Sequence, residues 1–414
     1  MDILSLLALC FTLVIAFIFK VNSGLMAIAV SLVLSLIAGI PGKFLIASFN
    51  SNLFLMLLGV MYLFSIAQEN KTLELLSKKT FALCRGNAKF LPVVIFLVAA
   101  VISAIGPGLI SVTALVSVLI VALAKEMDTQ PIRLVPFGLM GAFGGGLTPI
   151  TPTGIVASNV AGSCGITGAE GPVAIKMFLT CALFAAILYF FVFKWHKAKR
   201  VPLAQSASEP IPPFSIKQIA TMAGIVVVAV VSSVFRLNVG LVSFVVAVVL
   251  TLFKVADEGA ALKKVPWGTL IMITGVGILI SLVTELGGID LLSSALTKLS
   301  TTHTASAIMA LLSGIMSWVS SASGVVMPTL IPTVPDMVNA LPGVDPLALV
   351  NSISIGANMA AISPLSSCGA LMLAAYTSSG DVSAKDRNKM FLQLFILSAS
   401  AVAFSGLLAL LGLY

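Results

Sequence analysis

Charged residues are scarce in this sequence. Asp, Glu, Lys and Arg make up 9% of the 414 residues, whereas hydrophobic residues make up 59% and the mean hydropathy is +1.14. A soluble domain carries roughly 25% charged residues, so this composition excludes an ordinary soluble protein. At about 20 residues per span, the chain has room for about ten membrane-spanning helices. We therefore expect an all-α polytopic protein of a bacterial-type inner membrane, embedded in the lipid bilayer.

The sequence also lacks the residue patterns of an intramembrane enzyme. It contains no HExxH motif, no pair of intramembrane aspartates and no histidine inside an apolar segment that would serve as a base. Its five cysteines show no CxxC spacing, so we expect neither a transition-metal site nor a cofactor. We attribute the net charge of +8 to cytoplasmic loops rather than to nucleic-acid binding. Enzymatic activity is therefore not predicted.

Ten apolar segments are suited to crossing a membrane as helices. Two longer apolar stretches, at 90–124 and 304–333, are each interrupted in the middle, by IGPG and SSASG respectively. Each interrupted stretch is either one broken helix or a re-entrant hairpin that enters and leaves the membrane on the same side. The ten other segments lie near 3–19, 25–41, 52–68, 133–162, 172–193, 216–234, 238–253, 268–286, 346–376 and 391–412.

The distribution of basic residues favours two hairpins. With both interrupted stretches as hairpins, most of the 23 basic residues fall in loops on one side, as the positive-inside rule requires of the cytoplasm. We therefore predict ten spans plus two re-entrant hairpins, with both termini on the exterior. The first hairpin then opens from the cytoplasm and the second from the exterior. The basic residues left on the exterior are Lys43, Lys176, Arg236 and Lys298.

The two halves of the chain resemble each other. LMLLGVMYLFSIAQENKTLELL at 55–76 aligns with IMITGVGILISLVTELGGIDLL at 271–292, and TPxTxxG from Thr148 corresponds to SPxSxxG from Ser363. Each half holds five spans and one hairpin, and an odd number of spans inverts the second half relative to the first. This is the inverted-topology repeat of secondary transporters. We expect residues 1–200 and 216–414 to form the repeats, with a cytoplasmic linker at 201–215 between them.

The segment that follows the hairpin in each half, which is the fifth element of that half when the hairpin is counted, contains a break rich in glycine, proline or serine. GGGLTPITPTG at 144–154 interrupts the segment 133–162, and SPLSS follows Asn358 in the segment 346–376. Inside a bilayer, non-helical backbone persists only where it is buried in protein or lines a watery cavity. Half-helices that begin at such breaks attract anions, and free carbonyls at the ends of others attract Na⁺. All fifteen acidic residues lie in loops or at span ends, so a carboxylate proton relay is missing and Na⁺ coupling is favoured over proton coupling.

The motifs GAFGGGLTPITPTGIV at 141–156 and SAIGPGLISVTALV at 103–116 resemble those of the malonate/dicarboxylate carriers. These carriers belong to the ion-transporter superfamily that also contains the divalent-anion:sodium symporters. The resemblance implies a homodimer that carries malonate or a C4-dicarboxylate with Na⁺ by an elevator motion. It also implies that a static scaffold holds the dimer interface, while the hairpins and broken helices move as a transport domain.

The resemblance further implies which residues bind ligands. The symporters carry a Ser-Asn-Thr signature at both hairpin tips, whereas this sequence has Gly-Pro-Gly and Ser-Ala-Ser, which leaves the number of cations open. The expected substrate contacts are Gly106, Pro107, Gly108, Thr151, Thr153, Ser321, Ala322, Ser323, Ser366 and Ser367. The expected cation ligands are Ser103, Gly106, Gly146, Thr148, Ser320, Ser323, Asn358, Ile362 and Ser363.

Two alternatives to a sodium-coupled dicarboxylate carrier stay open at this point. One is a proton-coupled permease for another organic anion, such as a hydroxy acid, a sulfonate or citrate. The other is an anion channel, although hairpins that open from opposite faces suit alternating access better than a continuous pore. Concentrative uptake driven by an ion gradient distinguishes a carrier from a channel.

The predicted topology is testable with one accessible cysteine. We expect a cysteine in place of Thr129, in a variant without the native cysteines, to react with a membrane-impermeant maleimide from the cytoplasmic side. The physical reason is that a re-entrant hairpin returns the chain to the side from which it entered. Labelling only from the exterior would contradict the two-hairpin topology.

Overall fold

The structure is a computed structural model that describes residues 1–82, 89–127, 129–197, 212–235, 237–377 and 382–414. The described residues form helices and connecting turns, and they contain no strand. The predicted linker at 201–215 lies mostly outside the described residues. Helices long and apolar enough to cross a membrane are found at Ser51–Glu69, Gly108–Lys125, Glu170–Val192, Trp267–Glu285, Pro346–Thr377 and Ala384–Leu410.

These six helices confirm an all-α polytopic membrane protein. A bent pair, Ala305–Trp318 with Ala322–Ala340, makes a seventh span if it is counted as one. Several further apolar helices are shorter than a full span, so the predicted number of ten stays a prediction. The outer surface carries many exposed large hydrophobic side chains, among them Leu36, Val118 and Phe253. A surface of this kind suits contact with lipid rather than water.

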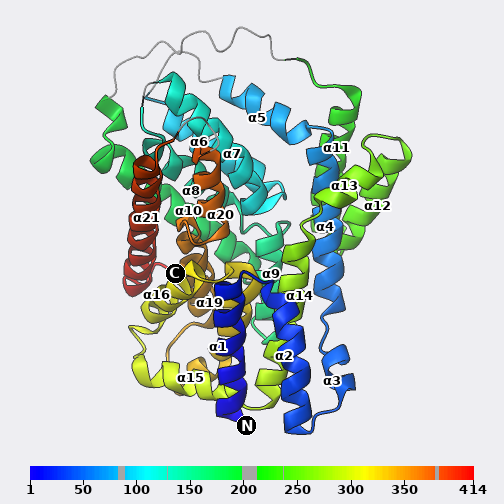
Figure 1. Cartoon of the computed structure of the whole chain (residues 1–414), viewed down its shortest axis with the longest axis vertical. Helices are drawn as coiled ribbons and strands as arrows, with labels where there is room; N and C mark the ends of the chain where they lie inside the picture. Colours follow the sequence, from blue (N-terminus) through cyan, green and yellow to red (C-terminus); the bar gives the residue numbers. More distant parts are fainter. Residues whose placement is uncertain (83–88, 128, 198–211, 236, 378–381) are drawn as a thin grey trace.

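The first half of the chain is described as thirteen helical elements (Figure 1). They are α1 (Asp2–Phe19), α2 (Ser23–Ala38), α3 (Gly42–Ala47), α4 (Ser51–Glu69), α5 (Thr72–Ala82), α6 (Leu91–Ala104), α7 (Gly108–Glu126), η1 (Pro131–Arg133), α8 (Val135–Gly145), α9 (Pro152–Ser163), α10 (Glu170–Ile187), η2 (Leu188–Val192) and η3 (Trp195–Lys197).

The second half follows a similar order of long and short helices. Its elements are α11 (Ile216–Phe235), α12 (Val239–Leu252), α13 (Glu258–Lys264), α14 (Trp267–Glu285), α15 (Gly288–Leu299), α16 (Ala305–Trp318), η4 (Ala322–Val326), α17 (Met327–Leu330), η5 (Ile331–Thr333), α18 (Val334–Ala340), α19 (Pro346–Met359), η6 (Ala360–Ile362), α20 (Ser367–Thr377) and α21 (Ala384–Leu410).

The two interrupted stretches fold as separate pairs of helices at opposite ends of the molecule. Helices α6 and α7 lie in the upper half of Figure 1, at the same end as α5. Helix α16, the first arm of the second stretch, lies in the lower half, where the N-terminus is found (Figure 1). The chain bends by 120° between α16 and the helical segment that starts at Ala322. Each stretch therefore turns at the residues where the sequence breaks.

Four helices outside the hairpins are joined in two pairs by close crossings. Helix α2 crosses α14 where Gly24 meets Gly275, and α12 crosses α4 where Gly240 meets Gly59. At each crossing a Cβ atom would overlap the backbone of the facing helix, so only glycine permits the approach. Small residues at a helix interface are how membrane helices maximise van der Waals contact.

The beginnings of these helices are fixed by asparagine caps. The side chain of Asn22 accepts from the backbone N–H groups of Gly24 and Leu25, at 2.9 and 3.4 Å. The side chain of Asn238 caps α12 in the same way and accepts from the backbone N–H of Gly240 at 3.0 Å. Both amide groups also donate across a helix crossing: Asn22 donates to the carbonyl of Gly268 at 2.7 Å, and Asn238 donates to the side chain of Asn52 at 2.9 Å. Each asparagine thus caps one helix and ties it to another.

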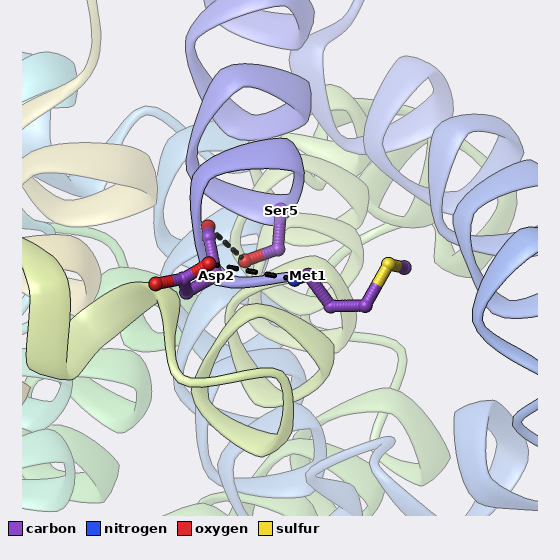
Figure 2. A network of polar contacts seen from close by, with 3 residues as sticks. All are labelled: Met1, Asp2 and Ser5. Carbon is purple, nitrogen blue, oxygen red and sulfur yellow. Dashed lines mark hydrogen bonds and ion pairs between the residues drawn. The ribbon is translucent and has the colours of Figure 1, made fainter.

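The first turn of α1 has a small polar network of its own, which Figure 2 shows. The amino group of Met1 lies 3.4 Å from a carboxylate oxygen of Asp2, and the hydroxyl of Ser5 donates to the backbone carbonyl of Asp2 at 2.8 Å. A negative charge at the start of a helix interacts favourably with the helix dipole. Ser5 is fully buried, because α1 packs against α15 at this end.

In the segments 133–162 and 346–376 the helices are interrupted at the positions of the predicted breaks. Helix α8 ends at Gly145 and α9 begins at Pro152, with the residues TPxT between them in turns. In the second half, η6 ends at Ile362 and α20 begins at Ser367. The glycine that follows each break packs against the preceding turn: a Cβ on Gly154 would overlap the carbonyl of Thr148. Both breaks therefore fold back tightly rather than forming open loops.

The glycine crossings generate a prediction with a matched control two residues away. We expect Gly275→Ala to lower the melting temperature of the purified protein, because its methyl group would overlap the backbone of Gly24. Overpacking of a closely packed site typically costs about 1–3 kcal/mol, and backbone atoms relieve it poorly. Gly277→Ala, in the same helix, has open space at its Cβ and is expected to leave the melting temperature unchanged or raise it. Equal melting temperatures for the two variants would contradict the crossing.

Candidate functional site

A cavity lies between the hairpin tips, α4 and the start of α14. Its volume is about 700 Å³, counting the part that opens to solvent. It is lined by Met61, Phe64, Ser65 and Gln68 of α4, Leu73 of α5, Gly106 to Ser111 around the first tip, Pro152 and Thr153 of α9, Lys264 of α13, Pro266, Thr269 and Ile273 at α14, and Ser323 of η4.

Several helices start at this cavity. Helix α7 begins at Gly108, α9 begins at Pro152, and α14 begins at Trp267, directly after the lining residue Pro266. The second arm of the other hairpin begins at Ala322, next to the lining residue Ser323. The first turn of a helix has backbone N–H groups without an intrahelical acceptor and a partial positive charge. The convergence of four such ends makes the cavity suitable for an anion.

The tip of the first hairpin has a backbone that only glycine adopts readily. Gly106 has φ of 138° and Gly108 has φ of 77°. A Cβ on Gly106 would also overlap the ring of Phe64, and one on Gly108 would lie 3.1 Å from Pro152. The tip is therefore packed directly against α4 on one side and against α9 on the other. Its glycines bring the backbone, rather than side chains, to the cavity wall.

Among the described residues that line this cavity, Lys264 is the only charged one. Its ammonium group forms an ion pair with Glu69 at the end of α4. Glu69 therefore lies at the end of α4 with a charged partner from another helix. The side chains of Lys264 and Glu69 are 41% and 24% exposed, so water reaches both charges.

Five of the predicted substrate residues line the cavity together. They come from three separate parts of the sequence, so the structure brings both hairpin tips to one broken helix. The five residues are Gly106, Pro107, Gly108, Thr153 and Ser323. Those that do not line it are Thr151, Ser321, Ala322, Ser366 and Ser367.

Thr151 instead holds the first break together. Its hydroxyl group donates to the carbonyls of Gly146 and Thr148, at 2.7 and 2.8 Å. The same oxygen accepts from the backbone N–H of Gly154 at 3.2 Å. It is therefore the N-cap of α9, directly before Pro152 at the first helical position. Ser321 has the same role in the second hairpin, since it accepts from Gly324 at 3.1 Å. These hydroxyls stabilise the breaks from within.

Two of the predicted cation ligands, Gly106 and Ser323, line the cavity, and the other seven do not. Among the described residues, the hydroxyl oxygens of Ser103 and Ser320 and the amide oxygen of Asn358 are buried without a hydrogen-bond partner. Thr148 donates to the carbonyl of Ala104 at 2.8 Å, which ties the first break to the first tip. The remaining predicted ligands, Gly146, Ile362 and Ser363, are buried at the two breaks, where the Ser363 hydroxyl accepts from Leu365 at 3.2 Å.

Sequence reasoning missed the wall of the cavity that belongs to α4 and α13. Phe64, Ser65 and Gln68 face the hairpin tip from α4. Their spacing of three and four residues places them on one helix face, which is a detectable signal. Ser65 also aligns with Ser281 in the second half. Lys264 carries no such signal, because it meets Glu69 only through the packing of α13 on α4.

Similar proteins agree with a transporter fold. The crystal structure of the Alcanivorax borkumensis YdaH transporter, whose description notes an unusual topology, has a TM-score of 0.61 to this chain at 13% identity. The match covers 89% of this chain and 87% of that one. At this identity the likeness concerns the fold alone. None of the curated proteins matches the sequence.

The sequence itself matches the model of a transporter family. A sequence model of the CitMHS family, described as citrate transporter, matches residues 13–356. This confirms the expectation of a transporter family, whereas specificity for malonate or a dicarboxylate stays a prediction. Because the match covers most of the chain, the protein belongs to the citrate transporter (CitMHS) family.

Proposed function

We propose that this protein is a secondary active carrier that moves a small organic polycarboxylate across the inner membrane together with Na⁺. The observation that carries this proposal is the convergence of four helix starts on one cavity. Partial positive charges of this kind hold carboxylates without a buried arginine or histidine. Membership of the citrate transporter family adds citrate to the malonate and C4-dicarboxylates suggested by the sequence motifs.

Coupling to Na⁺ is supported by the buried oxygens beside the cavity. Ser103 precedes the first tip and Ser320 precedes the second, and Asn358 lies just before the second break. Each presents a buried oxygen without a partner in the described structure. Unpaired buried oxygens are costly, and a hard cation such as Na⁺ is a natural partner for them. We assign the cation ligands to these oxygens and to neighbouring carbonyls at the breaks.

The transport mechanism that we propose is an alternating-access motion between two inverted repeats. The crossings Gly24–Gly275 and Gly240–Gly59 support it, because their residues are related by the same offset of 216 that aligns the two halves. Helices joined by these crossings form a scaffold, which in a homodimer would also carry the interface. The hairpins, α9 and α20 form the moving part, so the cavity lies between the moving and the static walls.

Uptake into proteoliposomes tests this function. We expect radiolabelled citrate or malonate to accumulate when an inward Na⁺ gradient is present, and not with matched K⁺ or choline gradients. The Na⁺ gradient supplies the free energy for concentration, which a channel cannot use. Stimulation at pH 6 relative to pH 8 without any Na⁺ dependence would instead indicate a proton-coupled carrier. Uptake of neither anion under any gradient would contradict the proposed function.

Two threonines separated by one residue test the location of the substrate. We expect Thr153→Val to raise the KM for the transported anion about threefold to tenfold, because it removes a hydroxyl at the cavity wall. Its melting temperature should stay near that of the unmodified protein. Thr151→Val is expected to lower the melting temperature, because loss of a helix cap costs about 0.5–2 kcal/mol. A raised KM in Thr151→Val together with a lowered melting temperature in Thr153→Val would contradict the placement of the site.

A further inference from the structure

Lys264 is the candidate for a residue that distinguishes substrates by charge. The tips and helix starts around the cavity offer partial positive charges, which are shared by every carboxylate that enters. Lys264 adds the one full positive charge among the described lining residues. It lies at the end of α13, shortly before the start of α14, and lines the same cavity as the tip at Gly106. A dianion with both carboxylates at the helix starts does not need this charge, whereas an additional carboxylate would use it.

The ion pair with Glu69 leaves Lys264 available to a ligand. An ammonium group has three N–H donors, and one carboxylate on an open side cannot occupy all of them. Both side chains remain partly exposed, and ion pairs of this exposure are weak in water. Glu69 therefore holds the lysine at the cavity wall without neutralising it completely. The carboxylate acts as a positioning group and the ammonium as a ligand-binding group.

We propose that Lys264, positioned by Glu69, binds the additional carboxylate of a tricarboxylate and so favours trianions over dianions. This inference rests on the proposed function, since it assigns a role within the same cavity. Two carboxylates of the substrate bind at the helix starts, and the third pairs with Lys264. The substrate class that this arrangement fits best is a branched tricarboxylate such as citrate.

The test compares two adjacent lysines. Lys264→Gln removes the charge at the cavity, and Lys263→Gln removes a charge on the same helix whose side chain does not line the cavity. Initial rates of uptake of citrate and of malonate are measured for both variants over a range of concentrations. We expect Lys264→Gln to raise the KM for citrate about tenfold, because hydrogen bonds to charged groups contribute at least this much, and to change the KM for malonate less than twofold.

Lys263→Gln should leave both KM values unchanged, and Lys264→Arg should restore most of the selectivity for citrate. Glu69→Gln separates a ligand-binding role from a structural one. If the lysine serves only to pair with Glu69, both Lys264→Gln and Glu69→Gln will affect citrate and malonate to the same degree. That result, or an unchanged citrate KM in Lys264→Gln, would overturn the inference.

A binding measurement covers the case in which a variant transports neither anion efficiently. The melting temperature of purified protein is recorded with citrate and with malonate. We expect stabilisation by citrate to be reduced in Lys264→Gln and retained in Lys263→Gln, while stabilisation by malonate is retained in both. Undiminished stabilisation by citrate in Lys264→Gln would overturn the inference alone. If the unmodified protein neither transports nor is stabilised by either anion, the proposed function fails, and the inference fails with it.

Discussion

Within a membrane every backbone N–H and C=O group has to find a partner inside the protein, and this constraint shapes the whole molecule. At both described breaks most of the interrupting residues are buried or partly buried against other segments. At the first break the hydroxyls of Thr148 and Thr151 donate to carbonyls of Ala104, Gly146 and Thr148 that the interrupted helices leave free. The polar residues of the motif thus stabilise the break, and the helix starts beside it form the surface that we propose binds the anion.

Glycine meets a second requirement of the same architecture, which is close contact between backbones. At Gly24–Gly275 and Gly59–Gly240 it lets long helices cross without an intervening side chain, and at Gly106 it lets a hairpin tip rest on the ring of Phe64. The crossings join helices that are distant in sequence, whereas the tip contact is a small surface of side chain against backbone. The small contact between the tip and Phe64 would break more easily than the crossings, in which two backbones are in direct contact.

Much of the fold was predictable from local patterns. The segment predicted at 268–286 is α14 at Trp267–Glu285, and the break at 144–154 separates α8 from α9, because hydropathy and glycine content act over short distances. The site was less predictable. Thr151 was predicted to bind substrate, although a threonine directly before proline is also the pattern of a helix cap. The pairing of Lys264 with Glu69 had no local signal, because it depends on how α13 packs against α4.

The charges of Lys264 and Glu69 also bear on the electrical behaviour of the carrier. Over the ion pair the two opposite charges sum to zero, although Lys264 keeps its ammonium at the cavity wall, and the other described lining residues are neutral. Movement of the empty cavity across the membrane field therefore transfers no charge, whichever wall moves. The current during turnover then reports the substrate and its accompanying ions alone. Under the proposed Na⁺ coupling, an anion balanced by its cations would cross without current, and every cation in excess would appear as inward positive charge that the membrane potential drives.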